Sequence, residues 1–252
     1  MKSLKPEILV VSCDKYKDIW PLYFKAFDKY WDDCKYDINL GNNFDDFDHK
    51  NVKTISVGKD LSYSSNLLKM LNEIKSEYII LWVEDLVLSN PVNNNLLKNI
   101  IEESISKDID FLKLNDMYPY SYNSKNELIG PLPNLIKYQI SIGVSLIKVS
   151  FLKEVINDGM SAWDIEYETS KKLEQKNYKI YALNKKIKCK PIQVRNILEK
   201  GKVIRNSEKI IREFNETNIL KNRKLQTWKS YIYYRLFHVY FKLLTFLNLY
   251  RK

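Results

Sequence analysis

The sequence lacks the patterns that identify several common classes of enzyme. Its six glycines form no GxGxxG, no P-loop and no GxSxG motif within the 252 residues. A Rossmann dinucleotide site, a Walker-type phosphate site and a serine-hydrolase nucleophile elbow are therefore unsupported. The two histidines, His49 and His238, are far apart in the chain, and no sequence pattern predicts a function for either of them.

Cysteine is also scarce. Cys13, Cys34 and Cys189 are odd in number and widely spaced, so they indicate neither a metal-binding pattern nor a disulfide framework. We expect a protein of a reducing cytoplasm. The short apolar run at residues 8–11 is followed by no small-residue cleavage pattern, which favours a first strand over a signal peptide.

Acidic residues are too few in the C-terminal part of the chain to balance its basic residues. Residues 195–252 hold 14 Lys and Arg but only 4 Asp and Glu, so this segment carries the whole formal net charge of +10. The remaining residues balance. This asymmetry predicts an appendage that meets an anionic surface, either lipid or nucleic acid.

Apolar residues then show an alternation of strand and helix periodicities. We expect strands at 7–12, 36–40, 51–57, 78–83, 109–114 and 138–147, with two more at 179–182 and 187–194. We expect helices at 20–31, from Ser62 or Ser64 to Ile74, and at 96–106, 150–157 and 163–176. The alternation predicts an α/β sheet covered by helices. Residues 115–137, rich in Pro, Asn, Ser and Tyr, predict a long functional loop or a small hairpin insertion.

The run from Tyr78 to Val83 ends in two adjacent carboxylates, Glu84 and Asp85. Six apolar or aromatic residues indicate a strand that is buried on both faces. Open α/β sheets bind ligands at the carboxyl ends of such strands, and a divalent metal carrying a diphosphate would compensate the two acids. The alternative is that the pair only caps the next segment.

Two other strand-to-helix turns carry small polar side chains. Ser12, Cys13 and Asp14 follow the first strand, and Asp60 and Ser64 lie before the second helix. These residues could contact a nucleotide base or ribose. An ordinary polar turn and a serine helix cap are the structural alternatives.

Three acidic and aromatic residues mark the start of the helix expected at 163. Asp164 or Glu166 could act as the general base that deprotonates an acceptor hydroxyl, and Trp163 could be an aromatic platform for a sugar ring. The helix dipole is a sufficient structural reason for the acids.

Lys200 and Lys202 flank a glycine, which allows close backbone approach and suits a diphosphate. A solvated basic turn is the alternative.

Taken in order, these motifs resemble those of bacterial GT-A-type glycosyltransferases from capsule and lipopolysaccharide biosynthesis clusters. The resemblance rests on S-C-D-K-Y at 12–16, G-x-D at 58–60 with the serines after it, E-D at 84–85, W-x-x-E at 163–166 and K-G-K at 200–202. It spans residues 7–205 and implies a GT-A-like, Rossmann-type mixed sheet. A strict D-x-D is missing, so Lys200 and Lys202 could partly replace a metal ion.

The resemblance implies transfer of a sugar from a nucleotide-sugar donor to a glycan acceptor. Ser12, Cys13, Asp14, Asp60 and Ser64 would line the nucleotide pocket, together with Lys200 and Lys202. Glu84 and Asp85 would stand where this fold places a Mn²⁺ or Mg²⁺ site. Glu166, or Asp164, would be the base of an inverting displacement.

The C-terminal segment, residues 206–252, is expected to form a basic, aromatic-rich helical appendage to a catalytic domain at 1–205. At 100° per residue, Arg235, His238, Lys242 and Thr245 fall on one stripe of an otherwise apolar helix. Such a helix fits the interface of an anionic bilayer and a lipid-linked acceptor, which predicts a peripheral protein on the inner face of the plasma membrane. Packing on the core or on a second subunit is the alternative.

Two other functions remain open. A nucleic-acid-binding protein without catalysis could use the basic aromatic segment, although acids at the sheet edge make nucleic acid an unfavoured partner. A nucleotidyltransferase would share the donor site but release pyrophosphate.

Overall fold

The computed structural model describes residues 5–115, 128–132, 139–173, 176–184, 187 and 189–246. Most of the loop expected at 115–137 lies outside the described residues. No helix in the described part of the chain is long and apolar enough to cross a membrane.

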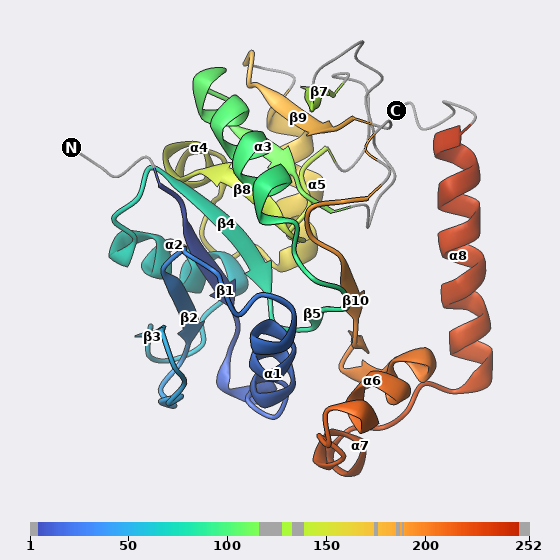
Figure 1. The fold of residues 1–252 in the computed structure, drawn as a ribbon. Coiled ribbons are helices and arrows are strands. Elements are labelled where there is room, and N and C mark those ends of the chain that lie inside the picture. The colour runs from blue at the N-terminus through green and yellow to red at the C-terminus, as the bar shows by residue number, and fades with distance from the viewer. Residues whose placement is uncertain are drawn as a thin grey trace.

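Eight strands form one mixed sheet in the described residues, in the order β3-β2-β1-β4-β8-β6-β9-β7 (Figure 1). Their bounds are β1 (Glu7–Val11), β2 (Ile38–Asn42), β3 (Val52–Ser56), β4 (Tyr78–Val83), β6 (Phe111–Lys113), β7 (Ile129–Pro131), β8 (Ser145–Lys148) and β9 (Ile180–Leu183). The first four strands in this order, β3, β2, β1 and β4, run parallel to one another. β8 runs antiparallel to both β4 and β6, and β6 is parallel to β9.

Helices cover both faces of the sheet (Figure 1). Helices α1 (Trp20–Tyr30) and α3 (Asn94–Ser106) pack on one face, and α2 (Tyr63–Glu73), α4 (Val149–Val155) and α5 (Ala162–Lys172) on the other. Alternate residues of each central strand point to opposite faces, so Ile80 and Trp82 join the first cluster while Ile79 and Leu81 join the second. The prediction that β4 is buried on both faces is confirmed.

The predicted fold class is confirmed: the chain forms an α/β structure with a mixed sheet and a C-terminal helix. Several boundaries of single elements were wrong. Strand β2 continues through Gly41 to Asn42, beyond the end expected at residue 40, because Gly41 pairs with both β1 and β3. The position is glycine because Met70 of α2 packs against it: a Cβ atom there would lie 2.2 Å from the Met70 sulfur.

Two predicted strands are shorter than expected. The strand expected from residue 138 begins at Ser145, where pairing with both β4 and β6 starts. The strand expected at 187–194 is instead β10 (Val194–Asn196). Pro191 lies in the earlier segment and has no N–H to donate to a ladder. Ser62 caps α2, as predicted, by accepting the Ser65 N–H at 3.1 Å.

Two small ribbons lie at the carboxyl edge of the sheet and were not expected from the sequence. The chain turns at Glu84 and Asp85 into β5 (Leu86–Leu88), which pairs with β10. Strands β11 (Leu198–Glu199) and β12 (Lys202–Val203) then form a hairpin. These ribbons bring residues 195–203 to the end of β4.

The last part of the chain divides into a packed and an exposed portion. Helices α6 (Glu208–Glu213) and α7 (Asn218–Asn222) insert Ile210, Ile211 and Ile219 into the core. Helix α8 (Trp228–Phe246) then runs alongside the body (Figure 1). The domain boundary expected at residue 205 stays a prediction. Tyr250 lies outside the described residues, as do the side chains of Phe241, Lys242, Thr245 and Phe246.

Candidate functional site

The topology of the sheet has a switch point between β1 and β4. From β1 the chain moves outward through β2 and β3, and then returns to the other side of β1 as β4. Ligands of open α/β sheets bind at such a point, beyond the carboxyl ends of the strands. Val11 is paired with Val83, so Ser12 and Glu84 emerge side by side at this edge.

The turn at Glu84 and Asp85 is held by its neighbours. The Trp82 indole N–H donates to the carbonyl oxygen of Leu86 at 2.7 Å, and the Ile197 N–H donates to that of Asp85 at 2.8 Å. The Ser12 hydroxyl accepts the Trp20 indole N–H at 2.7 Å, and it favours the ionised form of Glu84 by lowering the pKa of that carboxyl. The carboxylates are therefore placed by rigid groups.

These two carboxylates are short of compensating charge. Burial, and then the charge of Asp85, raise the pKa of Glu84 well above its ordinary value, and its side chain is only 6% exposed. Burial raises the pKa of Asp85 to about 7, although the Arg223 guanidinium opposes this shift. A buried charge without an adequate partner is costly, and perturbed acids of this kind mark functional sites.

Arg223 comes from far along the chain and was not predicted as a site residue. Its Nε and Nη2 donate to the two Asp18 oxygens at 2.7 and 2.6 Å, and Nη2 also donates to the Lys15 carbonyl at 2.8 Å. The guanidinium lies 4.6 Å from the centre of the Tyr16 ring. No sequence pattern marks Arg223, because its role depends on how the segment after α7 folds back.

A basic pocket of about 480 Å³ opens beside Arg223. It is lined by Asp14, Lys15, Lys17, Asp18, Gly201, Lys202, Asn222, Arg223 and Lys224. The structure thus brings the turn after β1 together with the basic hairpin. Lys200 and Gly201 have φ of 50° and 73°, the positive values that a two-residue type I′ hairpin requires, and this turn directs Lys202 into the pocket.

Three residues predicted for the nucleotide pocket also have structural partners. Asp14 accepts the backbone N–H groups of Asn43 and Phe44 at 3.0 and 3.1 Å. Asp60 accepts the Asn66 amide at 2.8 Å and lies 3.7 Å from the Lys15 ammonium. Cys13 is half-buried next to Glu84 and Asp60, and burial raises the pKa of its thiol.

Ser64 is not placed as a pocket residue. It is fully buried, and its hydroxyl accepts the Met160 N–H at 2.9 Å. The bond ties α2 to the turn that leads into α5. Its predicted contact with a nucleotide stays untested.

A second acidic centre lies on α5. Glu166 is 7% exposed and accepts the Ile142 N–H at 2.9 Å. Its charge acts on Lys113, a lysine at the end of β6 that is 2% exposed. Burial raises the pKa of Glu166 and lowers that of Lys113 to about 7. Lys113 was missed because it lies within the strand expected at 109–114, and nothing in the sequence shows that it is buried close to Glu166.

The other two candidates on α5 are exposed. Asp164 accepts both the N–H and the hydroxyl of Ser161, at 2.9 and 2.7 Å, and the Asp164 N–H donates back to that hydroxyl. This is a capping box, and these bonds lower the pKa of Asp164. Trp163 is 67% exposed at the start of the helix. Of the two predicted bases, only Glu166 faces the interior.

The charges of both acidic centres act on one side chain. Tyr63 is the first residue of α2, and its pKa is raised well above the ordinary value. Burial is the main cause, followed by the charges of Glu84, Glu166 and Asp85. All three carboxylates are therefore close enough to act on one hydroxyl.

No group of three or more His, Cys, Asp or Glu side chains in the described residues is placed to hold a metal ion. Glu84 and Asp85 nevertheless fit a hard divalent cation, because their buried oxygens lack adequate counter-charge. Mg²⁺ is commonly bound by one or two carboxylates together with substrate phosphates and water. The pair and the adjacent basic pocket match that mode.

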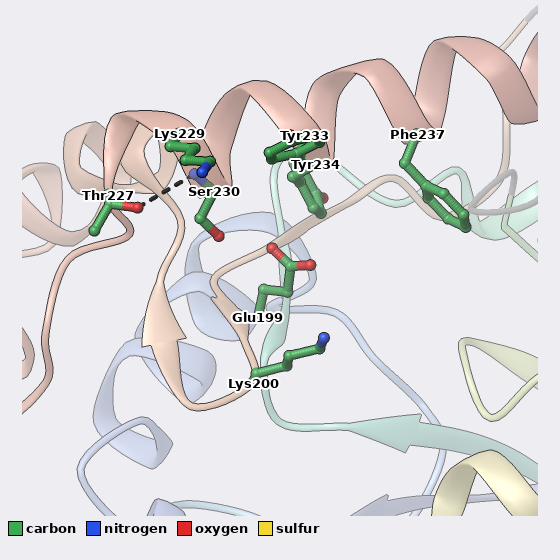
Figure 2. Close-up of a pocket in the computed structure, with 8 residues that line it drawn as sticks. All are labelled: Glu199, Lys200, Thr227, Lys229, Ser230, Tyr233, Tyr234 and Phe237. Carbon is green, nitrogen blue, oxygen red and sulfur yellow. Dashed lines mark hydrogen bonds between the residues drawn. The ribbon is translucent and has the colours of Figure 1, made fainter.

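A second pocket, of about 430 Å³, separates α8 from the β11–β12 hairpin. Figure 2 shows its lining residues: Glu199, Lys200, Thr227, Lys229, Ser230, Tyr233, Tyr234 and Phe237. Burial and the charge of Glu199 raise the pKa of Tyr234 to about 12, with a smaller contribution from Asp85. Lys200 thus lies in this second pocket, while Lys202 lies in the first.

No family model matches the sequence, and no curated protein does. A cytidylyltransferase from Leptospira borgpetersenii serovar Hardjo-bovis has a similar structure, with a TM-score of 0.48 and 10% identity over 89% of this chain and 100% of that one. S. aureus TarS 1–349 has a TM-score of 0.47 and 11% identity, and the match covers 71% of this chain and 60% of that one. The galactosyltransferase LgtC, in complex with donor and acceptor sugar analogues, has a TM-score of 0.41 and 11% identity. The match covers 67% of this chain and 70% of that one.

The similar structures thus include both a sugar-transferring and a nucleotidyl-transferring enzyme. At these scores they do not distinguish the two activities. Glu84 and Asp85 lie at the switch point of the sheet, and the charge of Arg223, which lines the basic pocket, acts on both of them.

Proposed function

We propose that this protein is a glycosyltransferase that moves a sugar from a nucleotide-sugar donor to a hydroxyl of a cell-surface glycan acceptor. One observation carries the proposal. The charges of Glu166, Glu84 and Asp85 all raise the pKa of the Tyr63 hydroxyl, which supports a general base and a diphosphate-binding edge in the neighbourhood of one side chain.

The donor side is assigned to the switch point. Ser12, Cys13, Asp14 and Asp60 would contact the base and ribose, and Lys202 and Arg223 would pair with the diphosphate through charge-assisted hydrogen bonds. Glu84 and Asp85 would hold a Mg²⁺ or Mn²⁺ ion, which would neutralise phosphate charge when bound.

The acceptor side is assigned to α5. A carboxylate oxygen of Glu166 takes the proton of the acceptor hydroxyl while the oxygen of that hydroxyl forms a bond to the anomeric carbon. The bond from this carbon to the diphosphate oxygen breaks in the same step, and its electron pair leaves with the nucleoside diphosphate. Attack opposite the leaving group inverts the anomeric configuration. Lys113 favours the ionised form of Glu166 that this role needs.

The alternative activity is nucleotidyl transfer, and the basic pocket is the observation that favours it. Lys15, Lys17, Lys202, Arg223 and Lys224 line that pocket and would suit a nucleoside triphosphate as well as a diphosphate. A nucleotidyltransferase would place no requirement on Glu166, which does not line the basic pocket.

The deciding experiment measures binding and then products. Thermal shift with UDP-, GDP- and CMP-linked sugars and with UTP, GTP and CTP, each with and without Mn²⁺, identifies the donor class. The bound donor is then incubated with glycan acceptors. Release of a nucleoside diphosphate or monophosphate supports the glycosyltransferase. Release of pyrophosphate from a triphosphate supports the alternative, and no binding by any nucleotide contradicts both.

We also propose that α8 lies on an anionic bilayer at the cytoplasmic face, where it would bring the enzyme to a lipid-linked acceptor. Tyr231, Tyr234 and His238 are half-buried toward the body. The large exposed residues of α8 are Trp228, Ile232, Tyr233, Leu236, Phe237, Val239, Tyr240 and Leu243. Of these, Tyr233 and Phe237 line the pocket between α8 and the hairpin. At 100° per residue Trp228, Ile232, Leu236, Val239 and Leu243 share the side away from that pocket, and Lys229 and Arg235 flank it, as in interfacial helices.

Replacing Ile232, Leu236 and Leu243 together by serine is expected to weaken binding to vesicles of three parts phosphatidylcholine and one part phosphatidylglycerol by more than about tenfold, since each side chain contributes about 1.5–3 kcal/mol when buried. Co-sedimentation measures the change. Phe44→Ser is the control, because Phe44 is 67% exposed on the body. Retention on single-stranded RNA without vesicle binding would favour the nucleic-acid alternative.

A further inference from the structure

The pocket between α8 and the β11–β12 hairpin has no part in the proposed reaction. Its volume of about 430 Å³ lies within the range of about 300–1,000 Å³ that is usual for small-molecule sites. Lys200 lines this pocket, and the next two residues of the turn, Gly201 and Lys202, line the basic pocket. The two pockets therefore share one hairpin turn as a common wall.

Contacts between the start of α8 and the hairpin hold the two walls of the pocket together. The backbone N–H of the fully buried Gln226 donates to the Val203 carbonyl at 2.9 Å, and its side-chain amide donates to a carboxylate oxygen of Glu199. The Arg205 guanidinium lies 4.3 Å from the centre of the Trp228 ring. A buried side chain thus orients Glu199, and the fold itself forms the pocket.

The pocket combines charges of both signs. Glu199 is directed toward α8, and Lys200 and Lys229 also line the pocket (Figure 2). In the part of the chain that the structure describes, neither of these lysines has a hydrogen bond or an ion pair, and the Tyr233 hydroxyl has no hydrogen bond. These groups are therefore free to bind a ligand.

Aromatic rings form the α8 wall of the pocket. Tyr233 and Phe237 are four residues apart and so lie one above the other on the helix surface, with Tyr234 beside them. Tyr233 is 64% exposed and Phe237 is 53% exposed. The faces of such rings carry partial negative charge, which attracts the polarised C–H groups of a sugar ring. A sugar can therefore stack on this wall while its hydroxyls reach the charged groups.

A neutral ligand with several hydroxyls matches these groups better than an ion does. Each hydroxyl can both donate and accept a hydrogen bond, so it can pair with an ammonium group and with a carboxylate. Glu199 would repel a phosphate, and Lys200 and Lys229 would repel a cationic headgroup.

The position of the pocket also favours a glycan over a lipid headgroup. The pocket lies on the side of α8 opposite the apolar side proposed to contact the bilayer. A helix with its side chains is about 10–12 Å across, so the pocket would stand about that far above the membrane surface. A lipid-linked acceptor reaches this height through its sugars.

We propose that this pocket binds a sugar residue of the acceptor glycan, with the sugar ring stacked on Tyr233. Glu199 accepts hydrogen bonds from the sugar hydroxyls, and Lys200 and Lys229 donate to them. The inference rests on the proposed function and deepens it, because it assigns the acceptor a contact outside the reacting centre. Since one turn carries Lys200 and Lys202, this sugar is bound next to the site assigned to the diphosphate.

Tyr233→Ala tests the proposal in the full chain without membranes. An array of immobilised neutral oligosaccharides containing glucose, galactose, mannose, rhamnose or N-acetylglucosamine identifies a bound glycan, and titration calorimetry then measures its Kd. We expect the wild type to bind at least one glycan, and Tyr233→Ala to bind it about fivefold more weakly because a stacked ring is lost. Vesicle binding should be unchanged, because Tyr233 lies on the pocket side of α8.

Tyr240→Ala is the matched control. Tyr240 is 57% exposed on the same helix, but it lies seven residues, or about 10 Å, beyond Tyr233 and is not among the residues that line the pocket. The affinity of this variant for the glycan should equal that of the wild type.

Glu199→Gln distinguishes a sugar from an anion in the pocket. The glutamine carbonyl can still accept the Gln226 amide, so the main change is the loss of negative charge. Glycan affinity should fall about threefold, because hydrogen bonds to a charged group are stronger than those to a neutral one. Binding of inorganic phosphate that tightens in this variant, with no glycan bound by the wild type, would instead show an anion site.

The inference is overturned if no glycan on the array binds, or if Tyr233→Ala binds the glycan as tightly as the wild type. It is also overturned if Tyr233→Ala loses vesicle binding, since that side of α8 would then contact the bilayer. Nucleotide binding without glycan binding would remove this inference and leave the proposed function in place. Glycan binding without any nucleotide binding would contradict the proposed function alone.

Discussion

Glu166→Gln is expected to lower kcat for sugar transfer by about 10²–10⁴-fold, the usual contribution of a positioned general base. The amide cannot take a proton from the acceptor hydroxyl. The glutamine carbonyl can still accept the Ile142 N–H that Glu166 accepts at 2.9 Å, so the position of the side chain should be kept. KM for the donor should change little, because Glu166 is assigned to the acceptor side.

Asp164→Asn is the matched control, since Asp164 lies two residues earlier on the same helix. Its carboxylate faces solvent and accepts from Ser161, and an asparagine oxygen can replace those bonds. We expect near-normal kcat for this variant. Initial rates at saturating donor, with the product anomer assigned by NMR, measure both variants. Full activity of Glu166→Gln would remove Glu166 as the base, and a collapse in Asp164→Asn would transfer that role to Asp164.

The second large effect is expected from Asp85→Asn, which should abolish donor binding but make the ligand-free protein more stable. Burial raises the pKa of Asp85 from 3.8 to about 7, so the ionised carboxylate destabilises the folded state. A shift of one unit corresponds to 1.36 kcal/mol. Solvent near the half-buried side chain screens part of this effect, so we expect a gain of about 2 kcal/mol in the free energy of unfolding above pH 7.

The pH dependence follows from the direction of the shift. Between pH 3.8 and about 7 the folded protein binds this proton more tightly than the unfolded chain, so the free energy of unfolding falls as the pH rises through this window. The penalty is absent below the window and complete above it. Asp85→Asn should therefore match the wild type near pH 4 and exceed it at pH 7.5, as measured by urea unfolding.

Asp108→Asn is a control that should change the free energy of unfolding in the opposite direction. Asp108 bonds to Lys148 at the other end of the sheet, and this bond lowers the pKa of Asp108. Removing its charge should lower stability at neutral pH. A stabilised Asp85→Asn variant that loses donor binding is typical of a residue kept for function at the expense of stability. A destabilised Asp85→Asn variant would instead indicate that Glu84 and Asp85 form a structural turn.

Much of the fold could be predicted because local patterns specify it. The six-residue run of β4 is apolar at every position, so both faces must be covered, and Ser62 has the side chain that a helix start needs. The ends of β2 and β8 could not be predicted in this way. Gly41 is read as a turn residue by local rules, but in the folded protein it pairs with both β1 and β3.

The candidate site shows the same division. Residues that directly follow a strand, such as Ser12 and Glu84, could be selected from the sequence because parallel strands end at a common edge. Lys113, Tyr63 and Arg223 could not. Their chemistry comes from burial and from groups distant in sequence: Glu166 for Lys113, Asp18 for Arg223, and the carboxylate charges that raise the pKa of Tyr63.

The sequence by itself determined the α/β class, the buried central strand with its two terminal acids, and the concentration of positive charge after residue 194. Each depends on composition and periodicity over a few neighbouring residues. The tertiary structure alone decided that Glu166 rather than Asp164 faces the interior, that Arg223 lies beside Glu84 and Asp85, and that α8 turns its apolar side outward. These outcomes depend on which surfaces pack together when the chain folds. Burial and electrostatic interactions are set by groups that are far apart in the sequence and close only in the folded protein.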